Sequence, residues 1–138
     1  MDFRTVVLSI MAFAVAPATY GQATKPEPEP GYDPATVVAM MATVTEVREV
    51  PQGSPLSGVH LVVKTERETI EVYLGPANFL KEMAVHFAIN DRLQIIGSKV
   101  KLRVGFIILA REVRKDSSTL YLRDQSGTPN WPPEKSRT

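Results

Sequence analysis

Residues 69–100, TIEVYLGPANFLKEMAVHFAINDRLQIIGSKV, contain the pattern that decides the fold of this chain. Thr69 to Leu74 alternates polar and apolar residues, which is the period of a β-strand with one buried face. Gly75-Pro76 then ends the strand, and proline suits the first turn of a helix. The apolar residues of the next segment follow helical spacing. The pattern therefore predicts a strand followed by one short helix over residues 77–85.

Further strands follow the predicted helix. Asn90-Asp91 indicates a turn, and residues 92–100 are typical of a strand whose central Gly97 marks a bulge or sharp bend. Residues 104–113 form the most apolar strand of the chain. Residues 119–123 form a short last strand, which we expect to pair as an extension of the fifth strand.

The segment before residue 69 supplies the first two strands. Residues 37–50 are rich in β-branched side chains and predict one long, bent strand. Residues 51–58 are dense in turn formers, and residues 59–65 alternate again, so they form a hairpin with the strand that begins at residue 69. A long bent first strand and a helix between the third and fourth strands are what a five-stranded OB-type barrel requires. We therefore expect this all-β fold, with a small open sandwich as the alternative.

Composition narrows the kinds of site that the chain can hold. Its 138 residues are 43% hydrophobic, close to the globular average, so one packed core is expected. The absence of cysteine excludes disulfides, zinc–thiolate sites and thiol nucleophiles. The formal net charge of +1 is well short of the basic charge expected of a dedicated nucleic-acid-binding protein.

The N-terminal part has the pattern of an exported protein. Val6 to Ala16 is an apolar run that contains one polar residue, Ser9; it is shorter than the roughly 20 residues of a transmembrane helix but right for the core of a signal peptide. We expect residues 1–23 to be that signal peptide, cleaved after Gly21 or Ala23. The mature chain is then expected to be periplasmic or secreted, with no transmembrane segment.

The rest of the chain divides into a linker, one domain and a tail. Residues 24–34, TKPEPEPGYDP, are expected to form a stiff, extended Pro/Glu-rich linker, because their prolines favour polyproline geometry. Residues 35–124 hold the predicted OB-fold-like barrel. Residues 125–138 are polar and Pro-rich, and we expect them to be a flexible C-terminal tail.

Several segments of this chain are similar to bacterial exported OB-fold proteins of the cell envelope. The residues that carry the resemblance are Ala42 to Val47, Thr69 to Gly75, Asn90 to Gly97, Ile108 to Val113 and Thr119 to Asp124. The chain resembles the BOF-like stress-tolerance domains and uncharacterised envelope OB-fold proteins that are sometimes labelled DNA-binding. Asn90 stands where such domains usually have glycine. The resemblance implies a fold and supplies no catalytic residues.

No motif in the sequence assembles a catalytic or metal site. His60 and His86 are the only histidines, and no nucleophile or further ligand stands at a suitable spacing. Both are expected at the surface, and Glu68 and Glu71 are expected to be solvated. Gly-rich phosphate loops and nucleophile elbows are missing from the sequence. We therefore predict a protein that is not an enzyme and has no cofactor or metal.

A basic stripe is the strongest candidate for ligand binding. Lys99, Lys101 and Arg103 stand two residues apart, so a continuing strand would project them from one face. OB barrels hold single-stranded nucleic acid with such cations and with exposed aromatic rings. Phe79, Phe87 and Phe106 are expected in the core. The candidate ligand-binding residues are therefore Lys99, Lys101, Arg103, Arg111, Tyr73 and Tyr121.

Three functional hypotheses follow from these residues. The first is a non-catalytic exported binding module that engages an envelope protein or an anionic ligand. The second is a single-stranded nucleic-acid-binding OB-fold protein, which a steep salt dependence of DNA binding would distinguish. The third is a small hydrolase that uses Glu71 or His60. The alternative to all three is a basic face that only keeps the barrel soluble.

Overall fold

The fold comes from a computed structural model, which describes residues 31–132. The predicted signal peptide, the linker up to residue 30 and the tail from residue 133 lie outside the described residues. Within residues 31–132, the elements are one 3-10 turn η2 (Pro34–Thr36), one helix and six strands. Their bounds are β1 (Val37–Val50), β2 (Gly58–Lys64), β3 (Thr69–Gly75), α2 (Ala77–Glu82), β4 (Arg92–Leu102), β5 (Gly105–Lys115) and β6 (Ser118–Tyr121).

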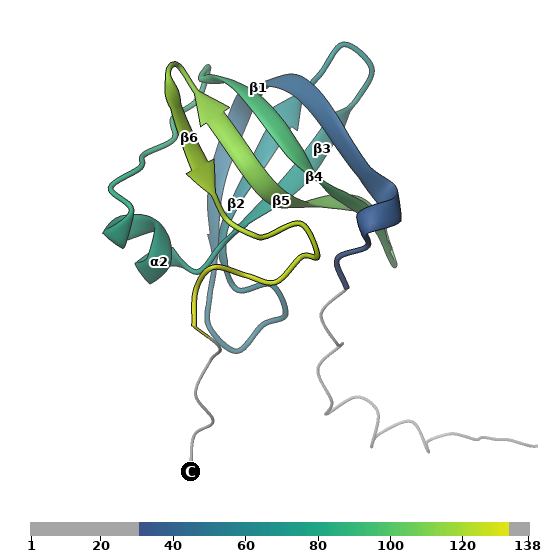
Figure 1. The fold of residues 1–138 in the computed structure, drawn as a ribbon. Helices are drawn as coiled ribbons and strands as arrows, with labels where there is room; N and C mark the ends of the chain where they lie inside the picture. The colour runs from purple at the N-terminus through teal and green to yellow at the C-terminus, as the bar shows by residue number, and fades with distance from the viewer. Residues whose placement is uncertain (1–30, 133–138) are drawn as a thin grey trace, which may run out of the picture.

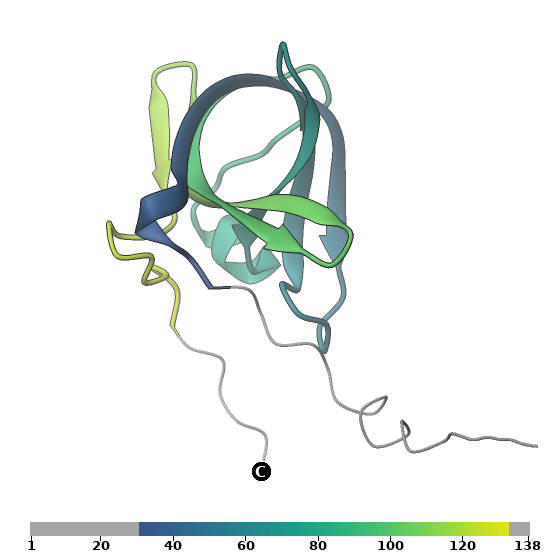
Figure 2. The ribbon, with the colours of Figure 1, turned by 90° about the vertical axis from the view of Figure 1, so that its right-hand side faces the viewer.

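The strands close into a barrel of the predicted kind (Figures 1 and 2). The hydrogen-bonded order is β3-β2-β1-β4-β5-β6, and an additional parallel pairing of β3 with β5 closes a ring of five strands. That pairing runs from Glu71 opposite Ile107 to Tyr73 opposite Leu109. The short helix α2 lies between β3 and β4. The fold is therefore all-β, a five-stranded OB-type barrel, as expected.

Strand β1 belongs to both sides of the barrel. Its first half, residues 37–43, pairs with β4, and its second half, residues 43–50, pairs with β2. The register to β2 shifts between Val44 and Glu46, and such a bulge bends a strand. The expected long, bent first strand is confirmed. Strand β6 pairs antiparallel with β5, as expected.

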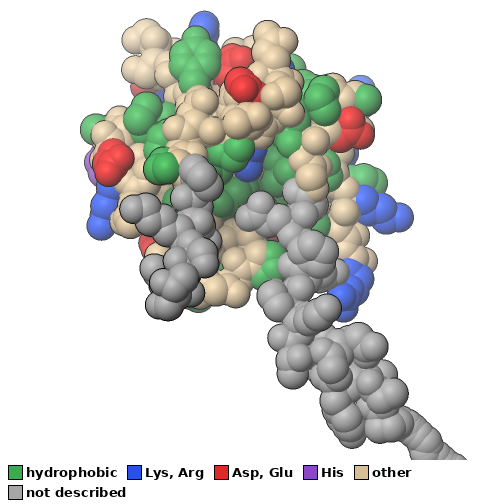
Figure 3. Space-filling model, turned by 60° about the horizontal axis from the view of Figure 1, so that its bottom comes forward, with side chains coloured by type: hydrophobic (Ala, Val, Ile, Leu, Met, Phe, Trp, Pro, Cys, Tyr) green, Lys and Arg blue, Asp and Glu red, His purple; other side chains and the backbone are tan. Residues whose placement is uncertain are grey.

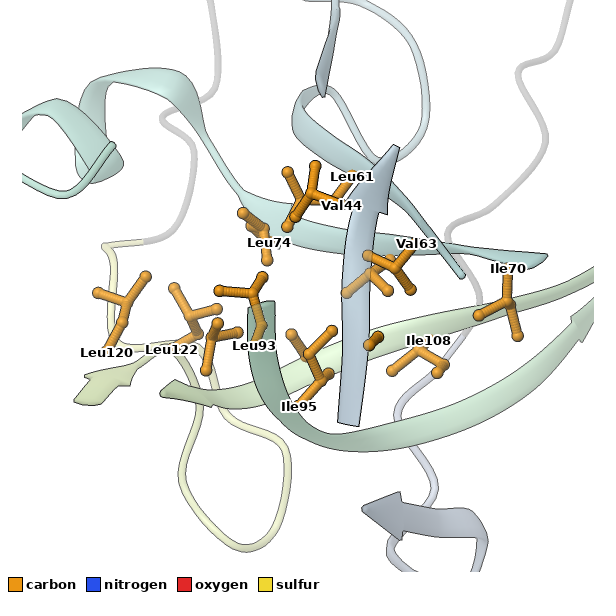
Figure 4. Close-up of a cluster of buried hydrophobic side chains, with 14 of the residues drawn as sticks. Val44, Leu61, Val63, Ile70, Leu74, Leu93, Ile95, Ile108, Leu120 and Leu122 are labelled. Atoms are coloured by element: carbon orange, nitrogen blue, oxygen red, sulfur yellow. The ribbon is translucent and has the colours of Figure 1, made fainter. Parts of the chain in front are cut away.

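The inward faces of the strands form the main core (Figure 4). Ile95 and Ile108, predicted to be buried on the two most apolar strands, are both 0% exposed. Glycine at position 97 allows β4 and β5 to approach each other, because a Cβ there would collide with the backbone oxygen of Leu109. The register between β4 and β5 shifts at this point, so the predicted bulge is confirmed. The core contains, among others, Val44, Leu61, Val63, Val72, Leu74, Leu93, Ile95, Ile108, Val113 and Leu122.

A second apolar cluster lies on the outer face of β3 and β5. Tyr73, Ile107 and Leu109 are buried there together with Leu56 of the β1–β2 loop. Trp131 packs against this cluster, with its ring 6.5 Å from that of Tyr73. Figure 3 turns the bottom of the molecule in Figure 1 toward the viewer and shows hydrophobic side chains gathered on that face.

Residues 125–132, the described part of the expected flexible tail, pack against the barrel. The Trp131 ring lies 5.3 Å from that of Phe79, and Asn130 donates hydrogen bonds to the carbonyl oxygens of Leu122 and Tyr121. The carboxylate of Asp124 accepts hydrogen bonds from the backbone N–H groups of Ser126 and Thr128, which fixes a turn. The polar, Pro-rich composition indicates a loose segment, but Trp131 and Asn130 attach residues 125–132 to the barrel.

Helix α2 is shorter than expected. It ends at Glu82 rather than at residue 85, because Ala84 adopts a positive φ of 58°, which cannot continue a helix. Leu80 is its buried residue. Within residues 31–132, no helix is long and apolar enough to cross a membrane.

Candidate functional site

A groove of about 780 Å³ follows the first half of β1. The turn between β2 and β3 forms its opposite wall. The groove exists because β1 pairs with β2 only from Thr43 onward, whereas β2 ends at Lys64 and turns away. Its lining residues are Val38 to Thr43, Lys64 to Glu68, Arg92 and Lys99.

The charges around this groove favour an anion. Its lining holds four cations and the two carboxylates Glu66 and Glu68, which gives a net charge of +2. Nζ of Lys99 lies 3.0 Å from Oε2 of Glu68, so one cation is neutralised across the groove. Within residues 31–132, no ion pair involves the exposed side chains of the other three cations. These cations are Lys64, Arg67 and Arg92.

The predicted basic stripe lies beside the groove and only partly within it. Lys99 lines the groove, and its side chain is 28% exposed, so the expectation that it is freely exposed is wrong. Its ammonium group is held between Glu68 and the ring of Phe106, 5.3 Å from the ring centroid. Lys101 and Arg103 are exposed, as expected, near the tip of the β4–β5 hairpin.

The β4–β5 hairpin extends beyond the ring of strands, as Figure 2 shows. Val104 at its tip is 93% exposed and Phe106 is 52% exposed. The prediction that Phe106 is a core residue is therefore wrong, because this part of β5 lies past the barrel wall. Phe79 and Phe87, expected in the core, are partly buried and pack against it.

Arg111 and the two tyrosines lie outside the groove. The Arg111 guanidinium lies 3.3 Å from the carboxylate of Glu112. Tyr73 is only 3% exposed and donates its hydroxyl hydrogen to the carbonyl of Ser57 over 2.9 Å, so it cannot serve as a stacking platform. Tyr121 is 56% exposed on β6. The six candidate residues therefore do not form one site.

His60 corrects another expectation, since it is buried and not at the surface. It is 4% exposed on β2, beneath the β1–β2 loop. Its Nε2 lies 2.6 Å from the carbonyl oxygen of Leu56, and its Nδ1 lies 2.7 Å from a carboxylate oxygen of Glu71. Glu71 is held further by Arg48 at 3.7 Å, so the expectation that Glu71 is simply solvated is also wrong. His86 is exposed, as expected.

The two ring nitrogens of His60 have different partners. A carbonyl oxygen only accepts, so Nε2 carries a hydrogen and donates it to Leu56. Nδ1 lies 2.7 Å from a carboxylate oxygen of Glu71, so this contact links β2 to β3. Nε2 therefore holds the β1–β2 loop onto the sheet, and Nδ1 connects two strands of the sheet.

Metal binding has no support in the described part of the chain. Residues 31–132 contain no group of three or more His, Cys, Asp or Glu side chains that could hold an ion. The acidic side chains at the β2–β3 turn are spread along the groove wall and one is paired with Lys99.

Sequence patterns alone missed the groove and two of its cations, Lys64 and Arg67. Lys64 and Arg67 flank the β2–β3 turn, and Arg92 begins β4. Their spacing in the sequence carries no common period, so only the pairing of β1 with both neighbours brings them together. The available signal was the length of β1, which exceeds that of β2.

Comparison with known proteins gives one match. The model of the MamS/MamX magnetosome protein family matches residues 36–120. The matched part is more than half of the chain and contains every residue that lines the groove, whereas Trp131 lies outside it. No curated protein matches the chain, and no solved structure matches it.

Proposed function

This chain belongs to the MamS/MamX magnetosome protein family, and we propose that it is a non-catalytic exported binding module for a protein or anionic ligand. From the family description we infer that the protein binds this ligand at the magnetosome. The observation that carries the proposal is the groove along β1, where cations outnumber carboxylates by four to two.

Electrostatics supports an anionic ligand in this groove. Cations grouped along a concave surface raise the local concentration of an anion and its rate of encounter, and added salt weakens both effects. Lys101 and Arg103 extend this positive field beyond the groove, toward the tip of the β4–β5 hairpin. A ligand with carboxylate or phosphate groups would therefore be attracted to the barrel before it reached the groove.

A binding role is favoured over the hydrolase hypothesis by the position of His60 and Glu71. Their contact of 2.7 Å lies under the β1–β2 loop, and neither residue lines the groove. A catalytic base must reach its substrate within hydrogen-bond distance. In this fold both residues act as structural supports.

Single-stranded nucleic acid is the less favoured ligand. Non-specific strand binding in OB barrels depends on aromatic rings on which bases stack. Among residues 31–132, no aromatic side chain lines the groove, and Tyr73 is covered. The predicted export of the chain also separates it from cytoplasmic nucleic acid.

The proposal is tested by capture from the cell-envelope fraction. The immobilised chain is compared with the groove variant Arg67→Gln/Arg92→Gln and with the control Lys81→Gln/Arg114→Gln, which removes two exposed cations elsewhere. We expect the control to retain the same components as the unmodified chain at low salt, and the groove variant to lose them. Identical retention by both variants would refute the groove as the binding site.

A further inference from the structure

We propose that the unpaired edge of β1, residues 37–42, binds an extended acidic segment of a partner protein as an added β-strand. This inference rests on the proposed function, because it names the class of ligand that the groove takes. Its basis is the backbone of β1 together with the charges on both sides of it.

The backbone of β1 has one free edge along its first half. Residues 37–43 pair with β4 on one side, whereas pairing with β2 on the other side begins only at Thr43. Within residues 31–132, no strand lies against residues 37–42 on that second side. Such an edge presents backbone N–H and C=O groups that an extended chain can pair with.

The groove lies beside the free edge of β1 and is large enough to hold an added strand. It lies along the same residues, Val38 to Thr43, and its volume of about 780 Å³ is typical of a ligand site. A strand of six residues is roughly 20 Å long and lies about 4.8 Å from its neighbour. Thr65 to Glu68 form the far wall, so the added chain would lie between β1 and the β2–β3 turn.

Side chains along the groove specify the chemistry of the added strand. Lys64, Arg67 and Arg92 lie along the groove without ion pairs among the described residues, so carboxylates on the ligand would pair with them. Met41, 51% exposed, and the partly buried Met40 supply apolar contacts. A segment that alternates acidic and apolar residues satisfies both requirements, since successive side chains of a strand point to opposite faces.

The first experiment uses synthetic peptides as probes and the purified chain as receptor. An eight-residue peptide that alternates glutamate and valine is compared with its lysine–valine counterpart by isothermal titration calorimetry. We expect binding of the acidic peptide and at least tenfold weaker binding of the basic one. Equal binding of the two peptides would overturn the acidic class of ligand.

The second experiment tests strand addition itself. Two versions of the acidic peptide carry N-methyl groups on alternate residues, one set on the odd and one on the even positions. An added strand turns only one set of N–H groups toward β1, so one version should lose binding at least tenfold and the other should keep it. Equal binding of both methylated versions would refute strand addition.

Amide hydrogen exchange locates the bound peptide. We expect slower exchange at residues 37–42 in the complex and unchanged exchange at β6, which serves as the internal control. Before any peptide is added, slowed exchange at those N–H groups of residues 37–42 that point away from β4 would mean that another segment already occupies the edge. Protection that increases with protein concentration would identify a second copy of the chain, and protection independent of concentration would identify its own N-terminal segment. Either result would overturn the proposed occupant.

The variants separate this inference from the proposed function. Arg67→Gln/Arg92→Gln should weaken binding of the acidic peptide at least tenfold, and Lys81→Gln/Arg114→Gln should leave it unchanged. If the groove variant loses its envelope ligands while both methylated peptides bind alike, the proposed function stands and strand addition is wrong. If neither ligand capture nor peptide binding changes in the groove variant, both are wrong.

Discussion

Two outer surfaces of the same barrel differ in whether other segments of the chain cover them. Over β3 and β5, the β1–β2 loop and the C-terminal segment cover the sheet, and Leu56 and Trp131 pack on Tyr73. Along the first half of β1, no described strand covers the edge, and cations line the space beside it. We call the first surface the covered face and the second the open groove.

The difference separates residues that hold the fold from residues available for a ligand. On the covered face, the Tyr73 hydroxyl donates to the Ser57 carbonyl, and its ring is buried. In the open groove, Lys99 is the only cation with a carboxylate partner among the described residues. Substitutions on the covered face should therefore change stability, and substitutions in the groove should change binding.

The largest effect is expected from a charge placed in the main core. Ile95 is fully buried in the core on β4, so Ile95→Asp would place an unpaired charge in an apolar interior. The cost of several kcal/mol or more is comparable with a total stability of about 5–15 kcal/mol. Circular dichroism should show an unfolded chain. A melting temperature equal to that of the unmodified chain would mean that the strand faces are assigned wrongly.

Removing the covering side chain tests the covered face alone. Trp131→Ala should lower the free energy of unfolding by about 2–3 kcal/mol, below the range for a fully buried tryptophan because Trp131 is only partly buried. Urea unfolding gives the value, with Tyr121→Ala on the exposed surface of β6 as the control. Binding of the acidic peptide should not change. A loss of unfolding free energy of less than about 0.5 kcal/mol, the size expected of a surface substitution, would show that the C-terminal segment does not stabilise the barrel.

The buried histidine offers a smaller test of the same face. His60→Leu removes the donor to the Leu56 carbonyl and the contact with Glu71, so we expect a loss of about 1–3 kcal/mol. His86→Ala, at an exposed position, should cost less than about 0.5 kcal/mol. Chemical denaturation compares the two variants. Equal stability would contradict the structural role of His60.

A surface ion pair near the helix gives a modest, pH-dependent effect. The hydrogen bond from Lys115 and that from the Ala88 backbone lower the pKa of Asp91 below its ordinary value. A lowered folded-state pKa contributes stability above the unfolded pKa of about 3.9, and this is lost as pH falls through the folded value. Asp91→Asn should cost about 0.5 kcal/mol at pH 7 and less at pH 2. Thermal unfolding at both pH values decides this, with Asp116→Asn as control.

The smallest effect on stability is expected beside the open groove. The triple variant Lys99→Gln/Lys101→Gln/Arg103→Gln should change unfolding by about 0.5 kcal/mol or less, because surface pairs such as Lys99–Glu68 contribute little. Capture of envelope ligands should nevertheless weaken at low salt. Unchanged capture by the folded variant would mean that these cations only keep the barrel soluble.

Local patterns in the sequence predicted the barrel well. The first strand was placed at residues 37–50, where the structure has it, because β-branched content and flanking turn residues are local signals. The alternation around Ile95 identified its buried face in the same way. The site depended on distant contacts, and so most of it could not be predicted. Tyr73 looks exposed by alternation until Trp131 packs against it.

His60 shows which additional reasoning would have helped. It pairs opposite Tyr73 in the β2–β3 hairpin, and that register places it beside Glu71. The hairpin was predicted, so a candidate His–Glu contact could have been derived from it. Its burial could not, because the covering loop folds back by contacts that have no period in the sequence. The export of the chain and its resemblance to BOF-like envelope proteins stay predictions.

The double pairing of β1 also has a consequence for the time that folding takes. The β2–β3 and β4–β5 hairpins join neighbouring segments and can form early, within microseconds for isolated hairpins. The first half of β1 must wait for β4, since Val37 pairs with Ser98 far along the chain. Such long-range pairing slows folding to the range of milliseconds to seconds. Until β4 arrives, both edges of residues 37–42 are unpaired, and in the finished barrel one of them stays so.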